Sequence, residues 1–533
     1  MTTTPKTTRI RTTATSPASR RAFLQRAAGF AALGGGGPLA LNLAALSSAS
    51  AQSASGYRAL VCIFLNGGND AFNMVLPTDD ASWAAYTTTR NQAPSSIALL
   101  KDVAPNPGAA ASSVERLGGV LPIAPLHAQG RSFALHPAMA GAKALFDARR
   151  LAVVANVGPL IAPTTKAQYG QSGHAKPAKL FSHNDQSSTW QSFRPEGASH
   201  GWGGLMGDVL AAGNGSGATF TAVSSSGSAV WLTGRSTLPY QVSSTGPIAV
   251  GWVDPGNGVR SLHGSTLGYQ ALRRIMTAAP TGGAGARPLH ADLATVYGRS
   301  LDAEGRLSSV LPPASMAPYG TPPTSGGYDQ NKDPLLQFTH PGTGQATGSS
   351  LARQLQAIAR LMAAGQAMGV RRQVFYASLG GFDTHDNQVA QHAMLMAQLS
   401  HALVYFDSVL GQLGLRDSVT TFTASEFGRT FTSNGDGTDH GWGAHHLVMG
   451  GGSLAGGDLY GRFPNYGSVR DAGSAFASSP DQLGNGVLLP SLSVDQYAYT
   501  LGRWMGVSEA NALAILPNLS RFNAAERNLG FLA

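Results

Sequence analysis

The chain has 533 residues, of which 43% are apolar and only 12% are charged, and it contains a single cysteine. This length suits one large domain or about three smaller ones, and the composition excludes a collagen, a coiled coil and a small disulfide-bonded scaffold. The formal net charge is +9, but six of the basic residues lie in residues 1–51, which contain no Asp or Glu. The remainder holds no basic run, so nucleic-acid binding is excluded as well.

The N-terminal segment has the features of an export signal. A pair of arginines (20–21) precedes an apolar stretch over 27–46, and the small residues Ala-Ser-Ala (49–51) follow. This order is typical of a secretory signal, and the paired arginines resemble the twin-arginine (Tat) motif. The alternative is an amphipathic or membrane-spanning N-terminal helix, which the Gly and Pro residues at 34–38 disfavour. We expect a Tat signal peptide over 1–51, export through the Tat translocase, and a periplasmic or secreted mature chain without a membrane span.

The first part of the mature chain predicts alternating strands and helices, which is typical of an α/β sheet. A continuous apolar run predicts a buried strand over 57–65, directly followed by a polar turn with Asn69 and Asp70. The next expected elements are helices over 81–90 and 138–149, a strand over 151–157, a polar loop over 181–193 and a helix over 203–212.

Residues 213–345 are rich in Gly, Ser, Thr and Pro, and they predict a loop-rich insertion or cap. The rest of the chain alternates again, which favours a mostly parallel central sheet with helices on both faces. The expected elements are a helix over 351–368, a strand over 373–379, a long helix over 387–413, strands over 419–424 and 447–449, and closing helices over 495–516. We therefore expect a single α/β domain over 52–533 that carries the insertion.

Polar side chains suited to metal binding follow the predicted strands. In open α/β sheets ligands bind outside the carboxyl ends of the strands, so these segments are expected to converge. Carboxylates and imidazoles suit Zn, Mn or Fe. Successive strand residues face opposite sides, so only one of His445 and His446 would point inward, and we favour His445. The candidate ligands are Asp70, Asp383, His385, Glu426, His440 and His445.

The acidic candidates and the nearby arginine each have a second interpretation. Asp70 alternatively closes a turn through its side chain, and Asp383 alternatively caps the following helix. Glu426 alternatively forms a structural ion pair with Arg429, or Arg429 grips an anionic group in a bidentate manner.

Four segments together resemble a large family of secreted bacterial proteins catalogued as domain of unknown function 1501. They are LNGGNDAFNMVLP (65–77), LGGFDTHDNQ (379–388), FTASEFGRT (422–430) and GTDHGWGAHHLVMGG (437–451). The Tat signal and the closing segments are similar too, and the resemblance runs over about 57–525, with little of it in 213–345. That family is similar in fold to the alkaline phosphatase and sulfatase superfamily. The resemblance implies an alkaline phosphatase-like fold, one or two bound divalent metals, and a nucleophile that attacks a phosphate or sulfate ester.

The resemblance also assigns residues. Asp70 matches the first-strand Asp of the superfamily, and Asp383 and His385 match the next Asp/His pair, although with closer spacing. His440 or His445 matches its late His.

Two positions depart from the superfamily. Glu426 stands where a second Asp-His pair begins, but Phe427 replaces the His. Chain order places the nucleophile between 158 and 189, where Ser182, His183 and Ser187 are candidates without a diagnostic motif. The resemblance further implies that Arg429 neutralises substrate charge.

These observations leave three functional hypotheses. The first is an exported hydrolase that uses Zn, Mn, Fe or Ca and acts on small-molecule or glycan phosphate or sulfate esters. The second is a non-catalytic secreted binding or envelope-associated protein on the same scaffold. The third, which only the Tat signal supports, is an oxidoreductase. The first hypothesis predicts bound metal and ester turnover, the second predicts neither, and the third predicts a redox-active cofactor.

Overall fold

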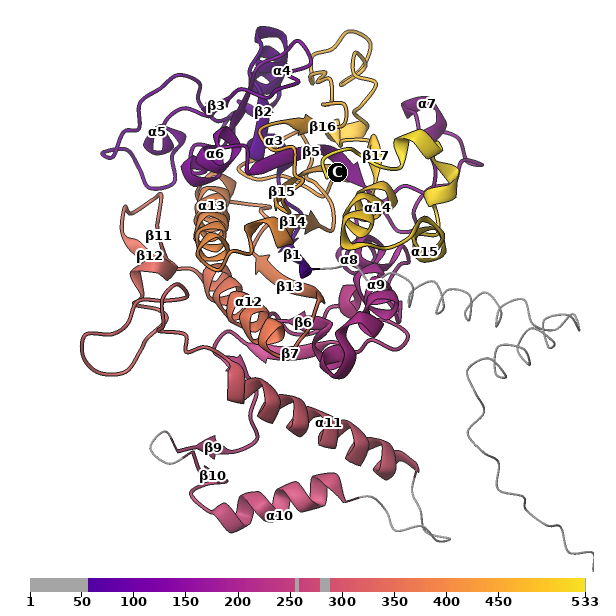
Figure 1. Ribbon diagram of the computed structural model, residues 1–533. Coiled ribbons are helices and arrows are strands. Elements are labelled where there is room, and N and C mark those ends of the chain that lie inside the picture. The colour runs from indigo at the N-terminus through magenta and orange to yellow at the C-terminus, as the bar shows by residue number, and fades with distance from the viewer. Residues whose placement is uncertain (1–55, 255–257, 279–287, 533) are drawn as a thin grey trace, which may run out of the picture. The chain divides into compact units, whose positions relative to one another are not determined.

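A ten-stranded mixed sheet forms the centre of the protein (Figure 1). The structure is a computed structural model that describes residues 56–254, 258–278 and 288–532, so the predicted signal peptide lies outside the described residues. The strand order is β16-β5-β15-β14-β1-β13-β6-β7-β8, and β17 pairs with β5. The strands are β1 (Arg58–Asn66), β5 (Leu151–Gly158), β6 (Ala222–Ser224), β7 (Tyr240–Ser243), β8 (Gly246–Pro247), β13 (Arg372–Gly380), β14 (Val419–Ser425), β15 (Ala444–Gly450), β16 (Leu459–Tyr460) and β17 (Leu492–Ser493).

The sheet is mixed rather than uniformly parallel, which refines the prediction of a mostly parallel sheet. β1 pairs in parallel with both β13 and β14, as expected for buried apolar strands. β15, however, runs antiparallel to both β14 and β5. The segment between β14 and β15 contains no helix, and a parallel return would require a crossover connection.

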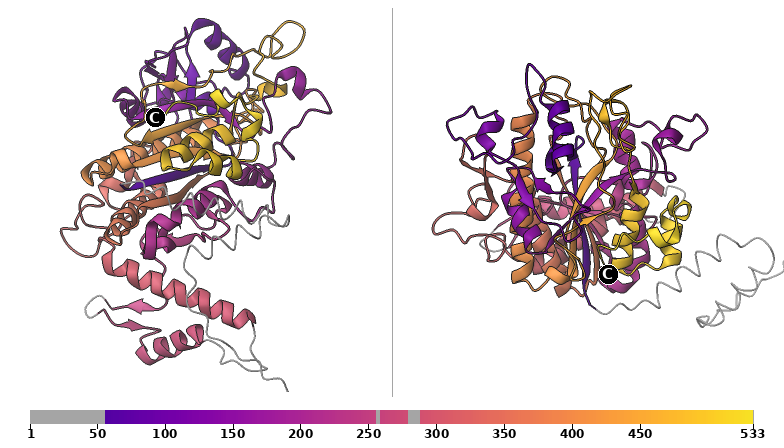
Figure 2. Two further views of the ribbon diagram at one scale, coloured as in Figure 1. Left: turned by 45° about the vertical axis from the view of Figure 1, so that its right-hand side comes forward. Right: turned by 90° about the horizontal axis from the view of Figure 1, so that it is seen from above.

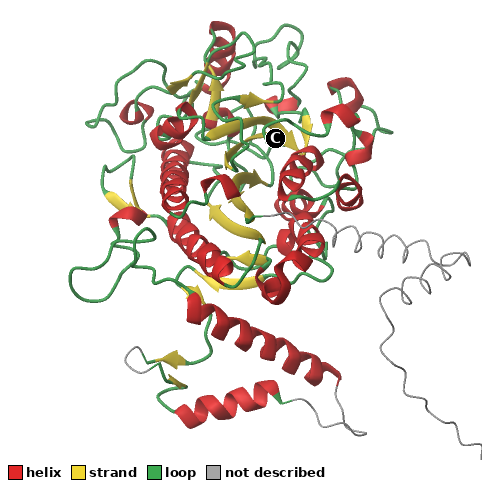
Figure 3. Cartoon of the chain, in the orientation of Figure 1, coloured by secondary structure: helices red, strands yellow, loops and turns green. Residues whose placement is uncertain are grey.

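Helices cover both faces of the sheet (Figure 1, Figure 3). Alternate residues of β1 point to opposite faces: Val61 and Ile63 join a core with α6, α12 and α13, whereas Cys62 and Phe64 join a core with α8, α9, α14 and α15. Figure 2 shows the two helical layers from further directions. The helices are α6 (Ala140–Asp147), α8 (His183–Ser192), α9 (Trp202–Leu210), α12 (Ser350–Ala367), α13 (Gln388–Gln412), α14 (Val494–Met505) and α15 (Glu509–Ile515).

Smaller elements surround these layers. A three-stranded sheet has the order β2-β4-β3, and β11 pairs with β12. These elements are β2 (Val75–Pro77), β3 (Leu121–Ile123), β4 (Phe133–Leu135), β11 (Gln337–Thr339), β12 (Ala346–Gly348), α3 (Ala71–Met74), α4 (Asp80–Arg90), α5 (Val114–Leu117) and α7 (Lys166–Tyr169). Segments of 3₁₀ helix lie at Ala211–Phe220, Val230–Leu232, Pro334–Leu336, Arg416–Ser418, Gly484–Gly486, Leu519–Arg521 and Ala524–Glu526.

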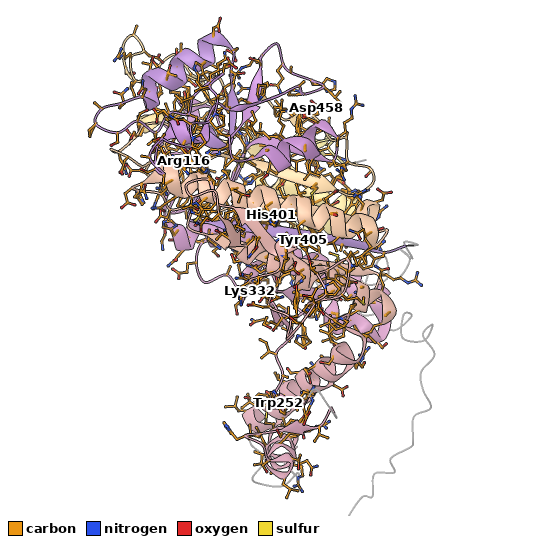
Figure 4. All side chains as sticks on the ribbon, turned by 90° about the vertical axis from the view of Figure 1, so that its left-hand side faces the viewer. Arg116, Trp252, Lys332, His401, Tyr405 and Asp458 are labelled. Atoms are coloured by element: carbon orange, nitrogen blue, oxygen red, sulfur yellow. The ribbon has the colours of Figure 1, made fainter. Side chains whose placement is uncertain are left out.

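The region 213–345 is divided between the central sheet and an added module. Its first strands, β6 to β8, form one edge of the sheet, so this part is not a separate loop-rich insertion. The module that follows contains β9 (Trp252–Val253), β10 (Arg260–Ser261), α10 (Thr266–Thr277) and α11 (Pro288–Val310). Trp252, labelled in Figure 4, is 58% exposed there. The C-terminal part of α11 packs Ala303 and Leu307 into the core that contains α12 and α13.

One helix of the described chain, α13, is long and apolar enough to cross a membrane by length and composition alone. Of its most apolar window, 72% is buried inside the protein, which is typical of a core helix. Figure 4 shows His401 and Tyr405 on this helix, and the Tyr405 hydroxyl donates to the Tyr319 carbonyl at 2.6 Å.

Candidate metal centre

The sheet topology brings segments that are distant in sequence to one edge. β1, β13 and β14 run parallel, so their carboxyl ends meet there. β15 runs antiparallel to β14 and begins at the same edge, a few residues after His440. β5, antiparallel to β15, ends at this edge as well, and the chain then leads to His183 at the start of α8.

Three imidazole rings surround the carboxylate of Asp383. The Nε2 atoms of His183, His385 and His440 lie 3.3, 3.0 and 3.3 Å from an oxygen of that carboxylate. The Nε2 atoms of His385 and His440 are 3.0 Å apart. Ligand atoms of His183, Asp383 and His440 all lie within 4.8 Å of one another. The four side chains are between 23% and 43% exposed, so the cluster is open to a solvent-borne ligand.

The opposite nitrogen of each ring faces an oxygen acceptor. Nδ1 of His440 lies 2.7 Å from the carbonyl oxygen of Phe181. Nδ1 of His183 lies 3.2 Å from Glu426 Oε1, and Nδ1 of His385 lies 3.3 Å from Asp439 Oδ1. A proton on Nδ1 satisfies all three acceptors and leaves the Nε2 lone pairs directed at the cluster. This arrangement is typical of histidines that bind a metal.

Arg429 holds the Asp383 carboxylate in place. Its buried guanidinium donates from Nη1 to Asp383 Oδ1 at 2.6 Å and to the Gly67 carbonyl at 3.2 Å. Nε and Nη2 donate to the hydroxyl and the carbonyl oxygen of Thr438. Burial by itself raises the pKa of Asp383, but the hydrogen bond and charge of Arg429, with His183 and His385, lower it below its usual value. Because Arg429 is fully buried and its three nitrogens donate within the protein, the prediction that it neutralises substrate charge is corrected to a positioning role.

Glu426 orients His183, and only one of its two carboxylate oxygens has a hydrogen-bond partner among the described residues. Its Oε1 accepts a hydrogen bond from the Gly67 amide at 2.6 Å and faces His183 Nδ1. Its Oε2 has no partner among the described residues, although the residue is 4% exposed. The hydrogen bond to Glu426 raises the pKa of His183 against the effect of burial. A buried carboxylate oxygen without a partner is costly, and positive charge nearby would offset that cost.

These donors fit a divalent transition metal. Three imidazole nitrogens and one carboxylate match the ligands that Zn, Mn and Fe accept. Ca, which takes oxygen ligands, fits less well. We therefore take His183, Asp383, His385 and His440 as the candidate ligand set and assign Glu426 to orienting His183.

Asp70 has a structural position that differs from its predicted role as a ligand. It is fully buried, and both carboxylate oxygens accept from Arg90, at 2.5 and 2.9 Å. It also accepts from the Gln388 side chain at 2.6 Å and from the Phe72 amide at 3.1 Å. Because its oxygens are occupied by these donors, we remove Asp70 from the ligand set.

His445, predicted as a metal ligand, and Ser182, predicted as a nucleophile, have other partners in the structure. His445 is buried in β15, where its Nδ1 accepts from the Asn156 amide at 3.0 Å and its ring packs 4.5 Å from that of Phe463. Burial lowers its pKa to about 3. The Ser182 hydroxyl donates to Asp185 at 2.8 Å. His183, predicted as a nucleophile candidate, instead belongs to the candidate ligand set, and the predicted loop 181–193 contains helix α8.

Several supporting groups were missed by the sequence analysis. Gly67 has a φ of +117°, and a Cβ there would lie 2.2 Å from the Asp383 amide nitrogen. At Gly437 a Cβ would lie 2.2 Å from the backbone of His385. Phe427 stacks on His440 with 4.6 Å between ring centres. The glycine-rich turns were a sequence signal for close backbone approach, whereas nothing local indicated the Phe181 carbonyl.

Residues 335–516 match the model of a family described as "Protein of unknown function (DUF1501)". The resemblance to that family is confirmed over this segment, which contains the proposed ligands Asp383, His385 and His440 together with Glu426 and Arg429. His183 precedes the segment.

Comparison with solved structures finds a similar chain from work on glycosaminoglycan metabolism by Bacteroides thetaiotaomicron. The two chains share 10% identity, the match covers 86% of this chain and 74% of that chain, and the TM-score is 0.31. At this TM-score the alkaline phosphatase-like fold stays a prediction. No match to a curated protein was found.

Proposed function

We propose that the protein is an exported, metal-dependent hydrolase of phosphate or sulfate esters. One observation carries the proposal: the Nε2 atoms of His183, His385 and His440 converge on Asp383, while each Nδ1 faces an oxygen acceptor. The partial exposure of these side chains supports a catalytic rather than a closed structural site. The N-terminal Tat-like signal supports export.

His183, Asp383, His385 and His440 would hold the metal, with Zn, Mn or Fe favoured. When bound, such a cation acts as a Lewis acid on a phosphoryl or sulfuryl oxygen. Arg429 keeps Asp383 ionised and oriented, and Glu426 and Asp439 orient two of the rings. In the described part of the chain, the four proposed ligands make no hydrogen bond to a Ser, Thr or Cys side chain. We therefore propose that water, rather than a covalent protein nucleophile, attacks the ester.

The proposal is tested by elemental analysis of the folded mature chain, residues 52–533, after exhaustive dialysis. We expect bound Zn, Mn or Fe, and loss of that metal in His440→Ala and Asp383→Asn with the fold retained by circular dichroism. The matched control is His127→Ala, because His127 is 83% exposed and also contacts an aspartate, Asp458, which is its one acidic partner among the described residues.

Screening with p-nitrophenyl phosphate and p-nitrophenyl sulfate follows the metal analysis. Turnover that is lost in both cluster variants and kept in His127→Ala supports the hydrolase. Absence of metal after incubation with each cation, together with absence of turnover, would refute it and favour a non-catalytic binding protein on the same scaffold.

A further inference from the structure

A polar hollow of about 340 Å³ lies along helix α8, which begins at the proposed ligand His183. Its volume is at the small end of the range for small-molecule sites. Among the residues that line it are Asn66, Asn184, Ser187, Gln191, Glu196 and Tyr376. Asn66 ends β1, Tyr376 lies within β13, Asn184, Ser187 and Gln191 lie on one side of α8, and Glu196 follows that helix.

The hollow and the cluster share chain segments. Asn66 directly precedes Gly67, whose amide donates to Glu426 and whose carbonyl accepts from Arg429. Asn184 directly follows His183 on α8. Burial raises the pKa of Tyr376, and the charges of Cys62 and Glu426 raise it further. A ligand in the hollow would therefore lie next to the proposed metal ligands.

Two polar groups of the hollow lack partners. The Tyr376 side chain is 5% exposed, and its hydroxyl makes no hydrogen bond to any other described residue. The side-chain amide of Asn66 likewise has no partner in the described part of the chain. Neither atom is among the fully buried polar atoms without a partner, so both are accessible and can hydrogen-bond a ligand in the hollow.

The wall chemistry selects the class of ligand. No Lys or Arg is among the described residues that line the hollow, and Glu196 is the one charged residue there. An anionic ester group would be repelled from such a wall and attracted to a metal cation instead. Amides, hydroxyls and a carboxylate are the groups that hydrogen-bond neutral alcohols.

We propose that this hollow binds a neutral sugar ring, the alcohol part of a phosphorylated or sulfated carbohydrate whose ester group reaches the metal cluster. The assignment of the ester group to the cluster rests on the proposed function. The binding of the sugar itself does not, because Asn66, Ser187 and Tyr376 are not metal ligands.

The test is saturation-transfer NMR of the mature chain with glucose, galactose, N-acetylglucosamine and cellobiose, with and without a chelator. We expect binding of at least one of these sugars that survives chelation. Tyr376→Phe keeps the ring and removes one hydrogen bond, so affinity should fall about 2- to 10-fold. Ser187→Ala provides a second variant with the same expected direction.

The matched control is Tyr460→Phe, because the Tyr460 hydroxyl donates to the Ala455 carbonyl and does not line the hollow. Failure of all four sugars to bind, or equal binding by Tyr376→Phe and Ser187→Ala, overturns the sugar site. Turnover of p-nitrophenyl esters without sugar binding would leave the proposed hydrolase standing and refute only this inference. Sugar binding in a protein without metal or turnover would support the sugar site and refute the hydrolase.

Discussion

Asp70 and Asp383 carry the same carboxylate but have opposite surroundings. Asp383 is 43% exposed, has one arginine partner and faces three imidazole nitrogens. Asp70 is fully enclosed, and Arg90 and Gln388 donate to its oxygens. Both follow predicted strands in polar turns, so their sequence contexts are similar. Their different partners come from distant segments, and only these partners separate a candidate ligand from a structural ion pair.

We predict that Asp70→Asn lowers the free energy of unfolding by about 3–5 kcal/mol, because it leaves the buried Arg90 charge without its carboxylate. The metal content of the folded protein should stay unchanged. Urea denaturation and elemental analysis of the same sample measure both effects, with the exposed Asp80→Asn as the control. Loss of metal at unchanged stability would return Asp70 to the ligand set.

Gly67 lies where two loops approach most closely. In Gly67→Ala the new methyl group would meet the Asp383 backbone, and the φ of +117° would be strained. We predict weaker metal binding and a loss of roughly 1–3 kcal/mol or more in stability. Gly380→Ala is the matched control, since no atom lies within 4 Å of a Cβ there. Equal behaviour of the two variants in calorimetry and metal titration would contradict the proposed close contact.

At the scale of elements, the buried strands were predicted well and helix α8 was not. The apolar run over 57–65 and the strand-forming segments over 373–379 and 419–424 were predicted as strands, and each agrees with the structure within a residue or two at either end. The run 181–193 is polar and has little amphipathic periodicity, so it was interpreted as a loop. It forms a helix because Trp190 packs in the core beside Trp202 and donor groups such as Trp202 Nε1 bond to it. Tertiary contacts thus outweigh weak local preference.

The N-terminus of α14 carries a buried carboxyl group, which predicts a pH effect on stability. Burial raises the pKa of Asp495 to about 7, although the Asn518 amide donates to it at 2.9 Å. The unfolded chain has a pKa of about 3.9 there, so between about pH 4 and about pH 7 the native state binds a proton that the unfolded state lacks. The free energy of unfolding should therefore fall as pH rises through this window and stay level above it.

The side chain in Asp495→Asn cannot titrate. The urea midpoint of this variant should therefore not show the fall between about pH 4 and about pH 7 that Asp495 causes in the wild type. The stability of the variant relative to the wild type should therefore be higher at pH 7 and above than at about pH 4. Parallel pH profiles of the two proteins would show that Asp495 stays ionised in the native state.

At the scale of the whole molecule, the candidate metal site and the added module use different parts of the chain. The site is built at one edge of the sheet from the segments that follow β13 and β14, the segment that precedes β15 and the start of α8. The module with α10 and α11 connects near β8, where Leu311 lies beside Gly246. Among the described residues, none of the proposed metal ligands forms a hydrogen bond or ion pair with this module.

We predict that replacing residues 249–300 with a flexible Gly/Ser linker leaves metal content unchanged. Ala303 and Leu307, which pack in the core, are retained by this design. Elemental analysis and thermal unfolding of the shortened and full-length mature chains measure the outcome. Metal loss in a folded shortened protein would show that the module supports the cluster.

The sequence by itself determined the central strands β1, β5, β13, β14 and part of β15, most of the helices and the segments that carry the polar residues. Apolar runs and helical periodicity are local properties, and they decide which stretches are buried. It also indicated Asp383, His385 and His440, because polar residues after parallel strands converge at one edge.

Only the tertiary structure decided the roles of these side chains. The antiparallel course of β15 and the helix at 183–192 brought His440 and His183 to Asp383. Asp70 forms a buried ion pair with Arg90 and is therefore not a candidate ligand. The Nδ1 atom of His445 accepts a hydrogen bond from the Asn156 amide. The reason is physical: the partners that set the charge and direction of a side chain lie far away in sequence, and folding alone brings them within hydrogen-bond distance.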